Sequence, residues 1–190
     1  MSVDNRFDTE TVAAIVLGTI LLVVSYFLLG VNTAVSDMCL IQIYAIVVVI
    51  LSAVYGAVAG FVIPFAAFII IYTANPGSTS VTGILFLVLF GVATGHYGRR
   101  FMLREGGFGG MRIVDYVVVE TVVAILVWVG INPLFEFYVR TADLRATMLR
   151  GISYSGVSIA TKLIIGLPLL LLLNRLYKKR RDVAAARDEL

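Results

Sequence analysis

The sequence predicts an all-α membrane protein, a bundle of six transmembrane helices with both termini in the cytoplasm. Hydrophobic residues make up 60% of the chain, charged residues make up 14%, and the mean hydropathy is +0.99. The apolar residues form six runs, each close to the roughly 20 helical residues that cross a hydrocarbon core of about 30 Å. The charges collect in a few of the gaps between these runs.

The runs define the elements in chain order. The first run follows mixed charges, without the cationic start of a cleaved signal peptide, so we expect it to be retained. Tyr55-Gly56 separates the second run from the third, which predicts a tight antiparallel hairpin. One membrane domain is expected, with residues 1–10 before the bundle, 11–177 forming it and 178–190 as a basic tail. The runs are Thr11–Leu29, Met38–Tyr55, Gly56–Tyr72, Val81–Tyr97, Tyr116–Ile131 and Tyr154–Leu173.

The distribution of Lys and Arg predicts the orientation, because cytoplasmic loops carry an excess of both. With the N-terminus inside, the inner segments hold eleven basic residues and the outer gaps hold three. The net charge of +3 then reflects topology and a tail facing anionic lipid, and no nucleic-acid partner is expected. The outer gap 132–153 is the longest, which predicts a polar loop able to form a lid.

Small residues recur four positions apart in three of the runs, where they allow helix backbones to approach closely. The pairs are Ala14 and Gly18, Gly56 and Gly60, and Gly91 and Gly95. Internal packing is the favoured interpretation of each pair. The first run is the best candidate for docking another membrane protein.

The glycine-rich run 106–110 lies in an inner gap beside arginines. A simple flexible loop is the favoured interpretation. The alternative is a movable joint or an adaptable contact.

Two ionisable residues lie inside predicted spans, where charges are costly and indicate function by default. Glu120 lies about one turn into the fifth span from the inner side, and Lys162 about two turns into the sixth from the outer side. At 1.5 Å per residue the two lie within about 10 Å of each other in depth. A structural ion pair or snorkelling is the favoured interpretation, and direct ligand contact is the alternative.

The chain lacks the residue patterns of an enzyme. Its single histidine, His96, and single cysteine, Cys39, offer no metal-ligand spacing, and no nucleophile or phosphate-loop motif is present. Neither a polar stripe along several helices nor internal duplication indicates a channel or a secondary transporter. We therefore expect a binding protein that holds no cofactor and no metal and leaves energy conversion to a partner.

A small polar ligand containing a ring would suit the outer loops and the outer halves of the last two spans, because a pocket needs apolar walls and a few placed polar groups. Aromatic residues near an interface are otherwise bilayer anchors. The candidate ligand-binding residues are Asn32, Asp37, Gln42, Tyr72, Asn75, Trp128, Asn132, Glu136, Tyr154, Ser155, Ser158 and Lys162.

Five short motifs occur in order along residues 11–179: TVAAIVLG, YGAVAGF, FGVATG, WVGINP and, after the leucine-rich last run, NRL. In this arrangement the chain resembles the S components of energy-coupling factor (ECF) transporters, the vitamin-binding membrane subunits of prokaryotes. The resemblance implies a plasma-membrane protein that binds a vitamin near its outer face, and that topples in the membrane during transport. It also implies assembly with a transmembrane coupling subunit and two cytoplasmic ATPases that use ATP. Residues Ala13, Ala14 and Gly18 would then contact the coupling subunit.

The similar subgroup often carries a histidine and an aspartate late in the third span, where this chain reads FIIIYT over residues 68–73. The missing polar pair allows a less polar and wider pocket. Cobalamin is therefore ranked first among substrates, ahead of pyridoxine-like or thiamine-precursor ligands and riboflavin. The alternative function is a non-transport membrane interaction or sensor protein.

Overall fold

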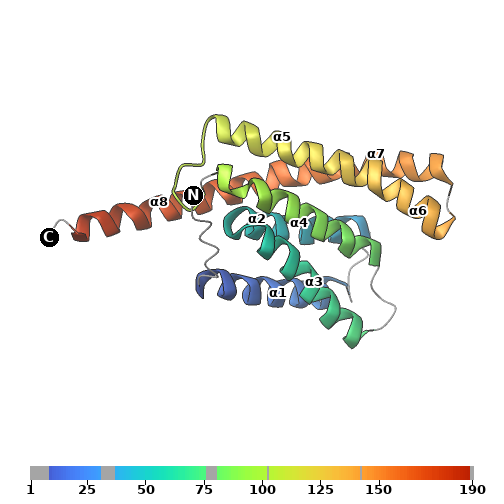
Figure 1. Cartoon of the computed structure of the whole chain (residues 1–190), viewed down its shortest axis with the longest axis horizontal. Coiled ribbons are helices and arrows are strands. Elements are labelled where there is room, and N and C mark those ends of the chain that lie inside the picture. The colour runs from blue at the N-terminus through green and yellow to red at the C-terminus, as the bar shows by residue number, and fades with distance from the viewer. Residues whose placement is uncertain (1–8, 31–36, 76–80, 102, 142, 189–190) are drawn as a thin grey trace.

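The computed structural model describes residues 9–30, 37–75, 81–101, 103–141 and 143–188, which form helices joined by short connections (Figure 1). The first four helices are α1 (Thr9–Gly30), α2 (Asp37–Tyr55), α3 (Ala57–Ala74) and α4 (Val81–Phe101). Two continuous helical rods follow. The first joins α5 (Met111–Ile125), the π-helix η1 (Leu126–Ile131) and α6 (Asn132–Arg140). The second joins α7 (Leu144–Thr161), the π-helix η2 (Lys162–Gly166) and α8 (Leu167–Asp188).

The six predicted runs coincide with these helices, so the all-α class is confirmed. Four helical segments are long and apolar enough to cross a membrane, namely Thr9–Leu28, Ala57–Ala74, Met111–Val139 and Leu144–Val183. The apolar segments found in α2 and α4 are shorter, Ile43–Tyr55 and Leu85–Gly98. The count of six crossings and the orientation of the termini stay predictions.

The predicted outer loop 132–153 is wrong, because α6 and α7 occupy most of it and leave residues 141–143 between them. Pro133 is the second residue of α6, directly after the π-helix η1. The carboxylate of Asp143 caps α7 by accepting hydrogen bonds from the backbone N–H groups of Arg145 and Ala146, at 2.8 and 3.4 Å. The mixed charges of this stretch therefore lie on a helical hairpin.

The predicted hairpin at Tyr55-Gly56 is confirmed, and small residues bring α3 and α4 into backbone contact. Gly56 has a φ of 91°, which a glycine adopts without strain. A Cβ atom added at Gly60 would overlap the backbone of Gly91 in α4, and one added at Gly95 would overlap the start of α3. In lipid, where the hydrophobic effect between helices is lost, such close packing holds helices together.

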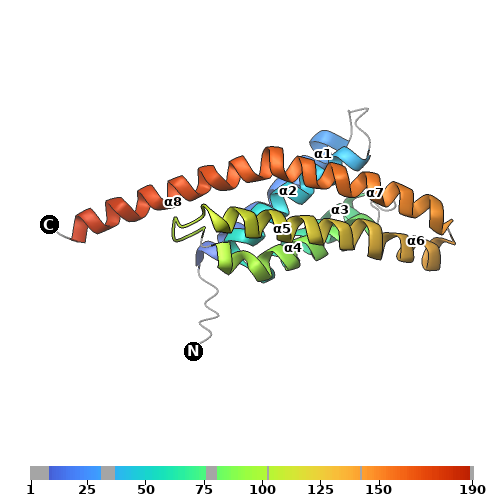
Figure 2. The same ribbon diagram turned by 90° about the horizontal axis from the view of Figure 1, so that it is seen from above.

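At one end of the bundle α8 extends beyond the other helices, while the α6–α7 turn lies at the opposite end (Figures 1 and 2). We call the first the basic end, because exposed cationic side chains gather on the helix ends and the α4–α5 connection there. They are Arg100, Arg104, Arg175, Lys178, Lys179, Arg180 and Arg181. The sequence predicts that this end faces the cytoplasm.

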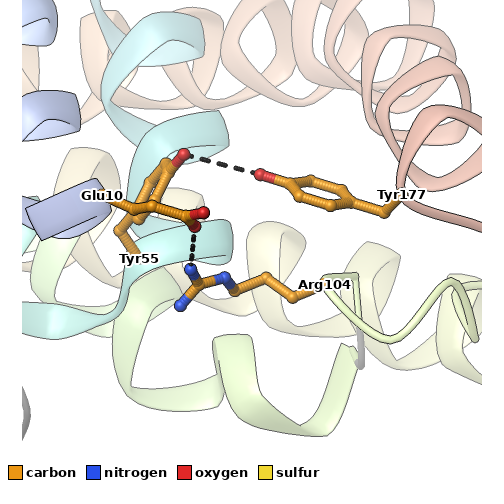
Figure 3. A network of polar contacts seen from close by, with 4 residues as sticks. All are labelled: Glu10, Tyr55, Arg104 and Tyr177. Atoms are coloured by element: carbon orange, nitrogen blue, oxygen red, sulfur yellow. Dashed lines mark hydrogen bonds and ion pairs between the residues drawn. The ribbon is translucent and has the colours of Figure 1, made fainter. Parts of the chain in front are cut away.

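Four side chains from different elements meet at the basic end (Figure 3). Arg104 of the α4–α5 connection pairs with Glu10 of α1 at 2.5 Å, and its guanidinium lies 5.4 Å from the ring centroid of Tyr55. The hydroxyls of Tyr55 and Tyr177, in α2 and α8, are 3.5 Å apart. This network joins the start of α1 to α8.

Candidate functional site

An ion pair lies in the interior of the bundle. Lys162 Nζ is 2.7 Å from Glu120 Oε2, and the two side chains are 1% and 2% exposed. The hypothesis that these residues pair is therefore confirmed. Lys162 lies about five turns into its rod, deeper than expected, because the rod begins at Leu144 and not near Tyr154.

The two oxygens of Glu120 have different neighbours. Thr94 of α4 donates a hydrogen bond to Oε1 at 2.5 Å, while Oε2 faces Lys162. The ammonium of Lys162 also lies 3.4 Å from the ring centroid of Phe90, a cation–π contact. Burial of two charges is less costly when each has a further polar or aromatic partner, and here α4 supplies both, Thr94 for Glu120 and Phe90 for Lys162.

Lys162 begins the π-helix η2, and Phe90 links it to Trp128 in the π-helix η1. In η1 the N–H of Asn132 donates to the carbonyl of Val127, and in η2 the N–H of Leu167 donates to that of Lys162 itself. Each bond spans five residues, so the helix is locally wider than an α-helix. Such π-segments are rare and frequently mark functional sites. A Cβ atom at Gly151 of α7 would overlap the carbonyl of Trp128, so α7 packs directly on η1.

Two buried hydrogen-bond donors near the ion pair have no partner in the part of the chain that the structure describes. The indole Nε1 of Trp128 and the Oγ of Ser158 have no hydrogen-bond partner among the described residues. The Trp128 ring packs at 5.1 Å from Phe86, 5.2 Å from Tyr154 and 6.4 Å from Phe90, measured between centroids. An unpartnered buried donor is costly, so these two groups are candidate contacts for a ligand or a water molecule.

The structure brings part of the predicted ligand site together. Trp128 packs against Tyr154 and, through Phe90, is joined to Lys162, while Ser155 and Ser158 lie on the α7–η2 rod between Tyr154 and Lys162. All five predicted residues except the half-buried Tyr154 are buried. Asn132 is buried and Glu136 half-buried further along the α5–α6 rod.

The remaining predicted ligand residues are not part of this cluster as described. Tyr72 and Asn75 are exposed at the end of α3. Asn32 lies outside the described residues. For Asp37 and Gln42 the structure describes only the backbone, which is helical in α2.

The predicted docking residues divide between two environments. Ala14 and Gly18 are buried, and a Cβ atom at Gly18 would meet the side chains of Leu51 and Ile63. Ala13 is exposed on the outer surface of α1. The role of all three in docking stays a prediction, with Ala13 on the accessible face.

Sequence reasoning missed Thr94 and Phe90 as members of the site. Thr94 is a hydroxyl residue inside an apolar run that Gly91 and Gly95 bring close to its neighbours, which is a signal that could have been used. No sequence feature indicated which aromatic ring would lie beneath Lys162, because α4 faces the last rod only in the folded bundle.

Long apolar helices around a paired charge define a multi-pass membrane protein built on an intramembrane polar site. Residues 6–175 match the family of ECF-type riboflavin transporter S components, and the chain belongs to this family. It is thus a transporter subunit of a bacterial membrane, and the family is not a class of enzymes.

Curated relatives extend over nearly the whole chain. A UPF0397 protein of Lactococcus lactis subsp. cremoris (strain NZ9000) is 26% identical over 96% of this chain and 97% of its own length. The UPF0397 protein YdcD of Lactococcus lactis subsp. lactis has the same identity and coverage. A UPF0397 protein of Lactobacillus johnsonii is 22% identical over 90% of this chain and 91% of its own. No solved structure matches the chain.

Proposed function

We propose that this chain is the substrate-binding subunit of an ECF-type importer and takes a B vitamin or vitamin precursor between η1 and the α7–η2 rod. The single observation that carries the location is the pair of buried, unpartnered donors, Trp128 Nε1 and Ser158 Oγ, in the same interface as the Glu120–Lys162 ion pair. Family membership supports the class of ligand.

The chemistry of the site favours a flat ring that accepts hydrogen bonds. Phe86, Phe90, Trp128 and Tyr154 offer ring faces and edges, which suit stacking against a planar ring. Trp128 and Ser158 can donate to carbonyl oxygens or ring nitrogens. Riboflavin, which the family description names, has both properties and is our first candidate. Cobalamin, ranked first from the sequence, is the second.

The proposal assigns no chemistry to the chain itself. A coupling subunit and two ATPases supplied by other chains would hydrolyse ATP, with the basic end on the cytoplasmic side. Because the site is buried, entry of the ligand requires η1 and α7 to separate at the end that carries the α6–α7 turn.

The test is saturable binding by the purified chain, measured by isothermal titration with riboflavin, cobalamin, pyridoxine and a thiamine precursor. For the vitamin that binds, Ser158→Ala should weaken binding by about tenfold, which corresponds to about 1.4 kcal/mol for one hydrogen bond. Ser153→Ala is the matched control, since Ser153 lies on the same helix but is exposed and bonds its own backbone.

If Ser158→Ala binds the vitamin as tightly as the unmodified protein, the ligand does not contact Ser158 and the proposed location is wrong. Failure of every vitamin to bind would remove the proposed function and favour the membrane interaction protein.

A further inference from the structure

A third buried polar atom close to the ion pair has no hydrogen-bond partner among the residues that the structure describes. It is the hydroxyl of Tyr116, whose side chain is fully buried. Tyr116 precedes Glu120 by four residues in α5, so the two lie on one face of the helix, with Tyr116 one turn nearer the basic end. The proposed ligand site does not use this hydroxyl.

The Tyr116 hydroxyl faces a buried space at Gly166, the last residue of η2. A Cβ atom added at Gly166 would lie 3.3 Å from this hydroxyl and 3.8 Å from the Cβ atom of Lys162. Apart from the adjoining turns of its own helix, no other described atom would lie within 4 Å of it. Protein interiors are normally close-packed, so Gly166 leaves room for a small molecule between the hydroxyl and Lys162.

The orientation of the hydroxyl is fixed, because other aromatic rings hold the Tyr116 ring edge to face. Its centroid lies 5.6 Å from that of Phe101 and 6.0 Å from that of Phe108. Phe108 is held by the Asn174 side chain, which accepts a hydrogen bond from Phe108 N at 2.9 Å and donates one to Phe108 O at 3.0 Å. The glycine-rich run is thereby attached to α8, so the expectation of a simple flexible loop is wrong.

The facing atoms of the ion pair also have hydrogen-bonding capacity left. Lys162 Nζ and Glu120 Oε2 are 2.7 Å apart but are not aligned as a hydrogen bond, and the described residues give neither atom another hydrogen-bond partner. An ammonium group carries three donors, and a carboxylate oxygen accepts more than one hydrogen bond. Donors and an acceptor without partners therefore lie within one helical turn of the space at Gly166.

We propose that this space is a binding site for a buried water molecule that joins the Tyr116 hydroxyl to the Glu120–Lys162 ion pair. A water molecule both donates and accepts, so it suits a hydroxyl, an ammonium group and a carboxylate together. Buried waters typically make about three hydrogen bonds to polar groups that otherwise lack a partner. A bound ion would instead add a charge to an interior in which the two charges already balance, at a further desolvation cost.

The water site makes Tyr116 and Gly166 positioning residues for the ion pair. It is separate from the proposed vitamin site along the last rod, because Ser158 precedes Lys162 by four residues and Gly166 follows it by four. The ion pair thus has the proposed ligand contact one turn away on one side and the water one turn away on the other. The inference therefore does not depend on which vitamin binds.

The first test is the sign of a glycine substitution, measured by thermal unfolding of the full chain in detergent. Alanine in place of a helical glycine normally stabilises a helix. For Gly166→Ala we expect the opposite, a fall in Tm of roughly 3 °C, because the methyl group displaces the water and leaves the polar atoms without it. Gly156→Ala is the matched control, since Gly156 is exposed on the same rod, a Cβ atom there meets nothing within 4 Å, and its Tm should not fall.

The second test removes the hydroxyl alone. Tyr116→Phe should lower Tm by roughly 3 °C if the hydroxyl bonds a water, whereas loss of a hydroxyl without a partner would leave Tm unchanged or raise it. In a Lys162→Met background, where the water has lost one partner, this fall should be smaller. Tyr44→Phe is the control, because the buried Tyr44 belongs to the cluster around α1, and its effect should be the same in both backgrounds.

A Tm for Gly166→Ala at or above that of the parent, or no fall with Tyr116→Phe, would overturn the water site. An experimental structure of the unmodified protein that resolves ordered waters gives a direct readout should the variants fail to fold. It should show a water within about 3.2 Å of the Tyr116 hydroxyl. Other buried waters without one at this position would overturn the inference equally.

Discussion

Replacing one member of the buried ion pair should destabilise the bundle, whereas replacing both should restore most of the lost stability. Lys162→Met leaves the Glu120 carboxylate without its counter-charge in an interior where each side chain is at most 2% exposed. Breaking a buried pair in this way costs about 3–5 kcal/mol. In a chain of this length 3 kcal/mol corresponds to a fall in Tm of roughly 10 °C. Glu120→Gln should produce a fall of similar size, since Lys162 then lacks its anion.

The double variant Glu120→Gln with Lys162→Met should recover most of that loss. The glutamine can still accept the hydrogen bond from Thr94, and methionine fills the space beside Phe90 without a charge. The measurement is thermal unfolding of the three variants in one detergent, followed by helical circular dichroism. If the two single losses add in the double variant, the charges are independent and the reasoning from the pair is refuted.

Three further predictions concern packing and the ends of the helices. Gly60→Val should prevent assembly of folded protein, because the added side chain meets the backbone of α4. Gly130→Ala is the control, because a Cβ atom there meets nothing within 4 Å, and the yield of folded protein in size-exclusion chromatography should be unchanged. Asp143→Ala should lower stability by about 1 kcal/mol through loss of the α7 cap, with Asp143→Asn close to wild type in thermal unfolding. Arg104→Gln removes an exposed ion pair and should cost less than about 1 kcal/mol, a loss that vanishes in high salt. Equal folded yields of the two glycine variants would contradict the first prediction. Equal stabilities of Asp143→Ala and Asp143→Asn would contradict the second, and an Arg104→Gln loss that is the same at low and high salt would contradict the third.

The helices could be predicted from the sequence because the length and polarity of each run reflect the bilayer directly. The Tyr55-Gly56 hairpin and the internal use of Gly60 and Gly91 follow equally from local rules about glycine. The prediction of a loop over residues 132–153 fails because the fall in hydropathy there does not end the helix. A helix that continues past the hydrocarbon core needs no apolar run, and a cap such as Asp143 is enough to start the next one.

The site was predictable in its charges and not in its surroundings. An ionisable side chain in a lipid-embedded span is costly, so the similar depth of Glu120 and Lys162 favoured an ion pair or snorkelling, with ligand contact as the alternative. The rings and hydroxyls around them come from α4, η1 and α7. Which of these side chains face the ion pair depends on how α4 is rotated against η1 and η2. The α4–α5 connection shows the same limit, since nothing in a glycine-rich run indicates that the side chain of Asn174, 66 residues away, bonds the backbone of Phe108.

The packing also determines how a ligand between η1 and α7 could influence the surface of α1. One buried cluster contains Phe86, Phe90 and Trp128 together with α2 residues such as Val49, and a second contains Leu22 of α1 together with α2 residues such as Val48. The two clusters therefore share α2 and also α4, because the second cluster contains Leu87 of α4 beside Ala59 and Ile63 of α3. A change at the site can therefore reach α1 through α2, through α4 and α3, or through the contact of Glu10 with Arg104 in the α4–α5 connection. Because energetic coupling requires an element with two arrangements, the route that operates is the one whose helix is displaced when the site is occupied.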